Sequence, residues 1–180
     1  MRIMGIDGAT NKTGIAIFED GKYEQHILID LHKIKDASER IPKMMIAICE
    51  YINEYHVDKV IMEKSMLTNN IDTVQKLSNL AGAVMLYTYS KNILFEYQYP
   101  SQWRKAIGLI QNNKIKKEIL KAEAIFAVKQ EYGLDVTDDV AEAILIARSG
   151  FDLPKIELNY NIQTIQNDWR KKEMVIHGNL

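Results

Sequence analysis

The chain opens with two short apolar segments separated by a small polar loop, all within Met1–Tyr23. The first segment ends at Asp7, which a glycine follows, and the second covers Ile15–Phe18. Short apolar runs bounded by turn residues are typical of buried β-strands joined in a hairpin. A carboxylate at the end of a central strand is costly to desolvate unless a cation lies beside it, which makes Asp7 a candidate metal ligand. Asp-Gly is equally common in plain turns, so the choice depends on whether other acids meet Asp7.

The composition indicates one soluble domain. A chain of 180 residues is long enough to bury roughly two-thirds of its unfolded surface, and its 47% hydrophobic and 26% charged residues are ordinary for a globular protein. No apolar run is long enough for a membrane span, and no signal-peptide pattern precedes the first strand, so we expect a cytoplasmic protein with no membrane partner. Cys49 is a single cysteine on an apolar helix face, and the four histidines lack metal-ligand spacing, which disfavours zinc.

Apolar periodicity predicts an α/β fold. After the hairpin we expect a third strand over 22–30, a helix over 37–55 that becomes regular near Arg40 because of Pro42, and strands over 57–63 and 92–98. Helices are expected over 71–90, 100–107, from Asn112 to Tyr132, and from Thr137 to Arg148. The apolar positions of the 71–90 helix, Met85 among them, are expected to face inward. This order predicts a mixed five-stranded sheet, with three antiparallel and two parallel strands, flanked by helices. Residues 1–154 form the predicted domain, and 155–180 form a C-terminal appendage.

Acidic residues from distant parts of the chain are expected to converge on this scaffold. Asp7 ends the first strand and Glu63 ends the fourth, and parallel strands place their carboxyl ends at one edge of a sheet. Asp139 and Glu142 are three apart on the last helix and point the same way, and Asp138 competes with Asp139 because it is four residues from Glu142. Two simpler explanations remain open: acids in a first helical turn stabilise the helix dipole, and Glu63 can pair with its neighbouring lysine.

Clustered carboxylates with no matching cation repel one another, and divalent cations relieve that repulsion. An oxygen-only ligand set suits Mg²⁺ or Mn²⁺. Two such ions about 4 Å apart stabilise the attacking and leaving oxygens of a phosphoryl displacement. The predicted reaction is therefore phosphodiester hydrolysis with two Mg²⁺ ions per site, for which Mn²⁺ substitutes.

Four segments in this order resemble the RNase H-like nucleases, and most closely the RuvC-type Holliday junction resolvases. They span Met1 to Arg148 and read GIDGATNKTGIAIF, VIMEKSMLTNN, YPSQWRKAIGL and DDVAEAILIA. The resemblance implies that the metal ligands are Asp7, Glu63, Asp139 and Glu142. It also implies a homodimeric, Mg²⁺-dependent endonuclease that resolves four-way DNA junctions by symmetric paired nicks in recombination and repair. Glu142 departs from the Asp more usual at its position in that family.

Basic residues gather between Ser101 and Lys121, where six cations face a single acid. Such a local excess in a nearly neutral chain predicts contacts with DNA phosphates. The candidate DNA-binding residues are Arg104, Lys105, Lys114, Lys116, Lys117 and Lys121. Of these, Lys114 or Lys117 is the candidate for stabilising transition-state charge. A solvated helix face is the alternative.

Two apolar residues have open roles at the DNA. Met66 lies where the family often has an aromatic residue that wedges between bases, and it is either such a wedge or a core residue. Trp103 either stacks on a base or anchors its helix in the core.

The small residues Ala81, Gly82 and Ala83 are a candidate dimer contact, although packing within one chain explains them equally. Three other functions compete with junction resolution: a silent junction-binding protein, a related nuclease acting on other branched DNA, single strands or RNA, and an actin-like phosphotransferase. The last requires a second phosphate-binding hairpin and about twice the length.

Overall fold

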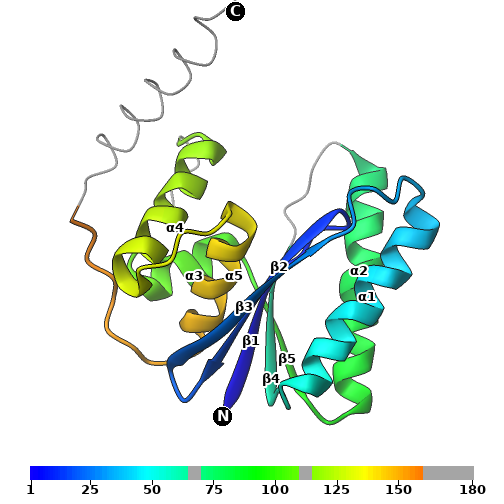
Figure 1. Ribbon diagram of the computed structural model, residues 1–180, viewed down its shortest axis with the longest axis horizontal. Helices are drawn as coiled ribbons and strands as arrows, with labels where there is room; N and C mark the ends of the chain where they lie inside the picture. Colours follow the sequence, from blue (N-terminus) through cyan, green and yellow to red (C-terminus); the bar gives the residue numbers. More distant parts are fainter. Residues whose placement is uncertain (65–69, 110–114, 160–180) are drawn as a thin grey trace, which may run out of the picture.

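A single mixed sheet organises the molecule. The structure is a computed structural model that describes residues 1–64, 70–109 and 115–159. The sheet has the order β3-β2-β1-β4-β5, in which β1 to β3 are antiparallel and β1, β4 and β5 are parallel (Figure 1). The strands are β1 (Arg2–Asp7), β2 (Lys12–Glu19), β3 (Lys22–Asp30), β4 (Lys59–Glu63) and β5 (Leu94–Gln98). The predicted fold class is confirmed.

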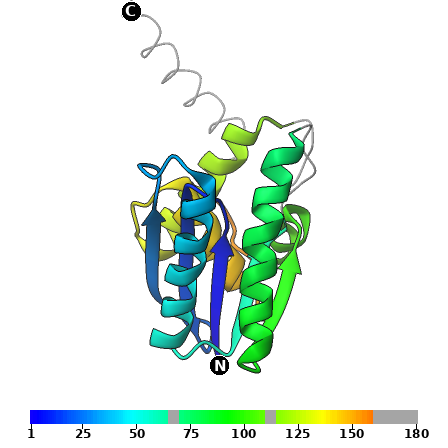
Figure 2. The same ribbon diagram turned by 90° about the vertical axis from the view of Figure 1, so that its right-hand side faces the viewer.

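Helices cover both faces of the sheet. Of the helices in the described residues, two lie on one face and three on the other. Figure 1 shows them to the right and left of the strands, and Figure 2 shows the molecule from the two-helix side. The pair is α1 (Ala37–Glu54) and α2 (Ile71–Ser90). The other three are α3 (Pro100–Ile107), α4 (Lys117–Tyr132) and α5 (Asp138–Ser149). No helix in the described ranges is long and apolar enough to cross a membrane.

The sheet separates two hydrophobic cores. Ile3 of β1 and Ile61 of β4 pack with α3, α4 and α5, whereas Met4 and Ile6 pack with α1 and α2. Because side chains alternate along a strand, Asp7 and Glu63 share the face of Ile3 and Ile61. Strand periodicity alone therefore directs both carboxylates toward α5.

Two helix starts and one side chain differ from the sequence-based expectations. α1 begins at Ala37, as the expected range does, but it is regular from there and not only from Arg40, because the side chain of Asp36 accepts from the N–H of Ser38 and caps the helix. Pro42 lies inside it, at the cost of one backbone hydrogen bond. α4 begins at Lys117 within the described residues. Met85 of α2, expected inside, is 46% exposed.

The chain remains packed on the domain just beyond the predicted boundary. Ile156 is buried, and its N–H donates to the carbonyl of Ile107 at 2.8 Å. Residues 160–180 lie outside the described residues. The division into a domain over 1–154 and an appendage over 155–180 stays a prediction.

Candidate metal centre and nucleic-acid interface

Glycines in the central strands let α5 lie directly on the sheet. A Cβ on Gly5 would be 2.3 Å from the carbonyl oxygen of Ala143, and a Cβ on Gly14 would be 2.0 Å from that of Asp139. Both contacts are with backbone, which cannot rotate away. Gly14 is also the cross-strand partner of Asp7. The N-terminal turn of α5 is therefore held against the end of β1.

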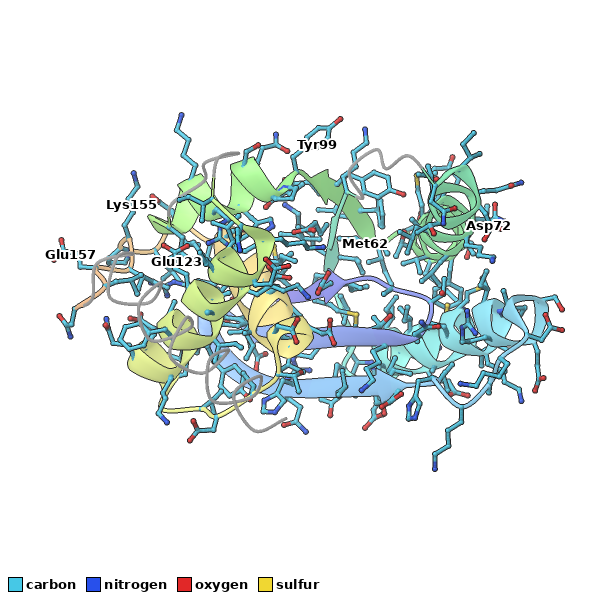
Figure 3. The ribbon with its side chains drawn as sticks, turned by 90° about the horizontal axis from the view of Figure 1, so that it is seen from above. Met62, Asp72, Tyr99, Glu123, Lys155 and Glu157 are labelled. Carbon is cyan, nitrogen blue, oxygen red and sulfur yellow. The ribbon has the colours of Figure 1, made fainter. Side chains whose placement is uncertain are left out.

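The four predicted carboxylates come together at this place. Asp7 ends β1 and Glu63 ends the neighbouring parallel strand β4, while Asp139 and Glu142 lie in the first turns of α5. All four are partly buried. Figure 3 shows this end of the molecule from above, with Met62 of β4 between the helix pair on one side and α4 with Glu123 on the other.

Burial and the negative charges of neighbouring acids act on this group of carboxylates. Burial, followed by the negative charges of Glu142 and Glu63, raises the pKa of Asp7 well above its ordinary value. Burial and the charge of Glu63 raise the pKa of Glu142 to about 7. Burial also raises the pKa values of Glu63 and Asp139. Raised pKa values in a group of acids mean that their ionised forms are unfavourable unless further positive charge lies beside them.

Asp138 has a different environment from Asp139. Its carboxylate forms an ion pair with Lys121 of α4, and the hydrogen bond from that lysine holds the pKa of Asp138 below its ordinary value, although burial opposes the shift. Asp139, in contrast, adds to the negative field at Asp7. The geometry thus separates two residues that helical spacing alone could not distinguish.

The donor set fits hard divalent cations. Carboxylate oxygens are the ligands that Mg²⁺ and Mn²⁺ prefer, and the raised pKa values show what bound cations would relieve. Within the described ranges no three acids converge closely enough to make a ready-made site.

Two residues, Trp103 and Lys121, interact with the acids in ways that the sequence did not predict. Trp103 is fully buried, and its indole Nε1 donates to Oε2 of Glu63 at 2.7 Å. The charge of Lys121 lowers the pKa values of Asp7, Glu63 and Glu142. Trp103 was expected either in the core or on a base, and the structure places it in the core. The segment YPSQWRKAIGL drew attention to Trp103. Its hydrogen bond to Glu63 joins residues that are 40 positions apart, so no local sequence pattern predicts it.

The basic cluster divides into surface and interior residues. Arg104 is 1% exposed and forms an ion pair with Glu123 of α4, so the expectation that Arg104 contacts DNA is corrected: its charge is compensated inside the protein. Lys121 is half-buried beside the acids. The exposed members are Lys105, Lys116 and Lys117. Met66 and Lys114 lie outside the described residues.

We expect the metal-free protein to lose stability as the pH rises from 5 to 8. The folded chain keeps protons on the Asp7 and Glu142 carboxyls at pH values where the unfolded chain has released them. Their contribution is therefore complete below the unfolded pKa and disappears as the pH passes the folded pKa, which for Glu142 is about 7. Thermal unfolding in EDTA should show a falling midpoint over this range, and Mg²⁺ at pH 8 should restore it. A flat or rising profile in EDTA would contradict the assignment of a strained acid cluster.

Comparison with known protein families identifies relatives along most of the chain. The family model for crossover junction endodeoxyribonuclease RuvC matches residues 3–147. The RuvC of Sulfurovum sp. (strain NBC37-1) is 31% identical over 151 residues, which cover 80% of this chain and 93% of the relative. The RuvC of Aliarcobacter butzleri (strain RM4018) is 31% identical over 154 residues, which cover 82% and 99%.

Solved structures share the fold. Thermus thermophilus RuvC in complex with a Holliday junction substrate superimposes with a TM-score of 0.66 at 17% identity, covering 83% of this chain and 92% of that one. The fowlpox virus resolvase, in complex with substrate Holliday junction DNA, gives 0.57 at 15% identity, with 83% and 96% covered. At such identities the likeness concerns the fold.

Proposed function

The chain belongs to the RuvC family of crossover junction endodeoxyribonucleases, and from that premise we propose that it is a cytoplasmic, Mg²⁺-dependent endonuclease that resolves four-way DNA junctions by symmetric paired nicks. One observation carries the proposal. Four acids from β1, β4 and α5 lie at one edge of the sheet, where burial together with the charges of neighbouring acids raises the pKa values of Asp7 and Glu142. An arrangement that is unfavourable by itself is expected where cations complete it.

We assign the metal-binding role to Asp7, Glu63, Asp139 and Glu142. Two Mg²⁺ ions, or Mn²⁺ in their place, would supply Lewis acidity at the attacking and leaving oxygens. Asp7 lies at the centre, because its pKa responds to the other three acids. Asp138 acts through Lys121 instead: their ion pair holds the lysine ammonium beside the four acids. Lys117, whose charge lowers the pKa values of Glu63 and Glu142, is placed to stabilise negative charge on the scissile phosphate.

We further propose a homodimer that uses α2, because a two-fold symmetric junction needs two matching sites. Four large apolar residues on α2 are exposed: Ile71 (80%) at its first position, and Met85 (46%), Leu86 (69%) and Tyr89 (82%) near its end. A cluster of this kind favours burial against a partner. Of the small residues, Ala81 packs into its own core, so packing within one chain explains it, whereas a Cβ on Gly82 would meet no atom within 4 Å.

The exposed lysines of α3 and of the start of α4 are expected to contact DNA phosphates. Replacing Lys105 or Lys116 with alanine should weaken junction binding and reduce the slope of log affinity against log salt by about 1 for each phosphate that is no longer neutralised. Anisotropy titrations of a labelled four-way junction in EDTA at several salt concentrations measure this slope. Lys91→Ala is the matched control, because Lys91 is an exposed lysine at the C-terminal end of α2 and belongs to neither α3 nor α4. Unchanged slopes would mean that Lys105 and Lys116 are only solvated.

Cleavage of defined substrates tests the function. The protein is incubated with four-way, forked, single-stranded, RNA and linear substrates, with Mg²⁺ or with EDTA. We expect Mg²⁺-dependent nicks in the four-way junction that DNA ligase reseals, which indicates 5′-phosphate and 3′-hydroxyl ends. In a plasmid with an extruded cruciform, paired nicks give linear DNA, whereas single nicks give open circles. Preference for single strands, forks or RNA would favour a related nuclease activity, and binding without cleavage would favour a silent junction-binding protein.

A further inference from the structure

The indole of Trp103 ties α3 to the carboxylate of Glu63. The tryptophan is fully buried, and its Nε1 donates to Oε2 of Glu63 at 2.7 Å. Indole has one polar group, which only donates, and leaving that group unpaired in the interior is unfavourable. The carboxylate therefore retains this bond when its other interactions change.

This bond compensates for the length of the glutamate. Glu63 is the last residue of β4, between buried Met62 and exposed Lys64, and its carboxylate lies one torsion further from the strand than that of Asp7. Longer side chains lose more rotamer entropy on ordering. The indole fixes Oε2, and a carboxylate has a second oxygen with lone pairs for a cation.

The helix that carries Trp103 is itself fixed. Arg104, the next residue, forms a buried ion pair with Glu123 of α4. At the helix start, the side chain of Gln102 accepts from the backbone N–H of Tyr99 at 2.7 Å. Lys64 N donates to the carbonyl of Gln98 at 2.8 Å, which holds the end of β4 beside the end of β5. The donor and the acceptor are thus on anchored elements, as orientation of a ligand requires.

We propose that Trp103 is a positioning residue that holds Glu63 in its cation-binding orientation. The inference rests on the proposed role of Glu63. Outer groups that orient metal ligands change metal affinity or activity by about 10- to 100-fold when they are removed. Trp103→Phe deletes the N–H and keeps an aromatic ring. It should raise the Mg²⁺ concentration for half-maximal cleavage and lower kcat within this range, while the affinity for the junction in EDTA stays unchanged.

Metal binding without DNA provides the readout that does not depend on activity. Calorimetric titration with Mn²⁺ should show weaker binding to Trp103→Phe than to the wild type. Phe18→Leu is the matched control, because Phe18 is fully buried on the same side of the sheet but packs on Tyr23, Tyr132 and Phe151. It should lower the melting temperature without changing the metal affinity. Equal losses of metal affinity in both variants would assign Trp103 a purely structural role and overturn the proposal.

An isostere keeps the test valid if Trp103→Phe does not fold. In a Trp169→Phe background, position 103 is the only remaining tryptophan, and it can be replaced by β-(3-benzothienyl)alanine, which has sulfur in place of the N–H. Weaker Mn²⁺ binding at an unchanged melting temperature supports the proposal, and binding equal to that of the tryptophan protein overturns it. Glu63→Gln distinguishes the proposed metal-ligand role of Glu63 from the proposed positioning role of Trp103. If it cleaves like the wild type, the role of Glu63 fails; if it is inactive while both Trp103 replacements bind metal normally, only the positioning role fails.

Discussion

Replacing Asp7 with asparagine is expected to reduce Mg²⁺-dependent cleavage by at least about 10³-fold, since loss of several kcal/mol of charge stabilisation corresponds to this factor. Junction binding in EDTA should persist, because the lysines that we propose to contact phosphates are not on β1. The same change should stabilise the metal-free protein at pH 8, because burial and three neighbouring acids make an ionised Asp7 unfavourable. Loss of activity together with gain of stability cannot result from misfolding.

Three further variants interpret that result. Asp135→Asn removes an exposed carboxylate that pairs with Lys129, and it should cleave normally. Asp138→Asn tests the competing ligand: if the ion pair with Lys121 is its main role, the loss should be smaller than for Asp139→Asn. Single-turnover rates measured across a range of Mg²⁺ concentrations compare all four proteins. Normal cleavage by Asp7→Asn would remove the basis of the metal centre.

Replacing Gly14 with alanine should damage both the fold and the site. The added Cβ would be 2.0 Å from the carbonyl oxygen of Asp139, so α5 must move away from β2. Overpacking of this kind costs about 1–3 kcal/mol, and here it also shifts the helix that carries Asp139 and Glu142. At about 2–4 °C per kcal/mol for a chain of this size, thermal unfolding should reveal the loss. The cleavage rate of Gly14→Ala should fall by more than the fraction of unfolded protein accounts for.

Gly82→Ala is the control for this substitution. Its Cβ would meet nothing within 4 Å, and alanine within a helix is more favourable than glycine by roughly 0.5–1 kcal/mol. The melting temperature should therefore stay level or rise. A Gly14→Ala protein that melts and cleaves like Gly82→Ala would show that α5 does not need its close approach to the sheet.

Much of this architecture could be predicted from local pattern. The bounds of α2 and α3 agree with the expected ranges 71–90 and 100–107, and the strand order follows from the crossover rule. The regular part of α1 was expected to begin too late, near Arg40, because a capping aspartate, Asp36, outweighs the unfavourable Pro42. Met85 was placed inside because helical periodicity gives the direction of an apolar face but not the width of the region that the protein covers.

The sequence predicts those residues of the candidate site that lie at the ends of strands. Asp7 and Glu63 follow from strand ends, but the separation of Asp138 from Asp139 depends on Lys121, a residue of another helix. The burial of Arg104 likewise depends on Glu123, 19 residues away. In a charge count Arg104 is one of six equivalent cations. Only tertiary structure shows that its charge is already neutralised.

The separation of the two cores has a practical consequence for redesign. Substitutions among the residues that α1 and α2 bury against the sheet can change melting behaviour and self-association while the acidic edge keeps its shape. Substitutions beneath α5 alter folding and cleavage together. A library confined to the α1–α2 half should therefore yield thermostable variants that retain activity, and one confined to the α5 half should seldom do so.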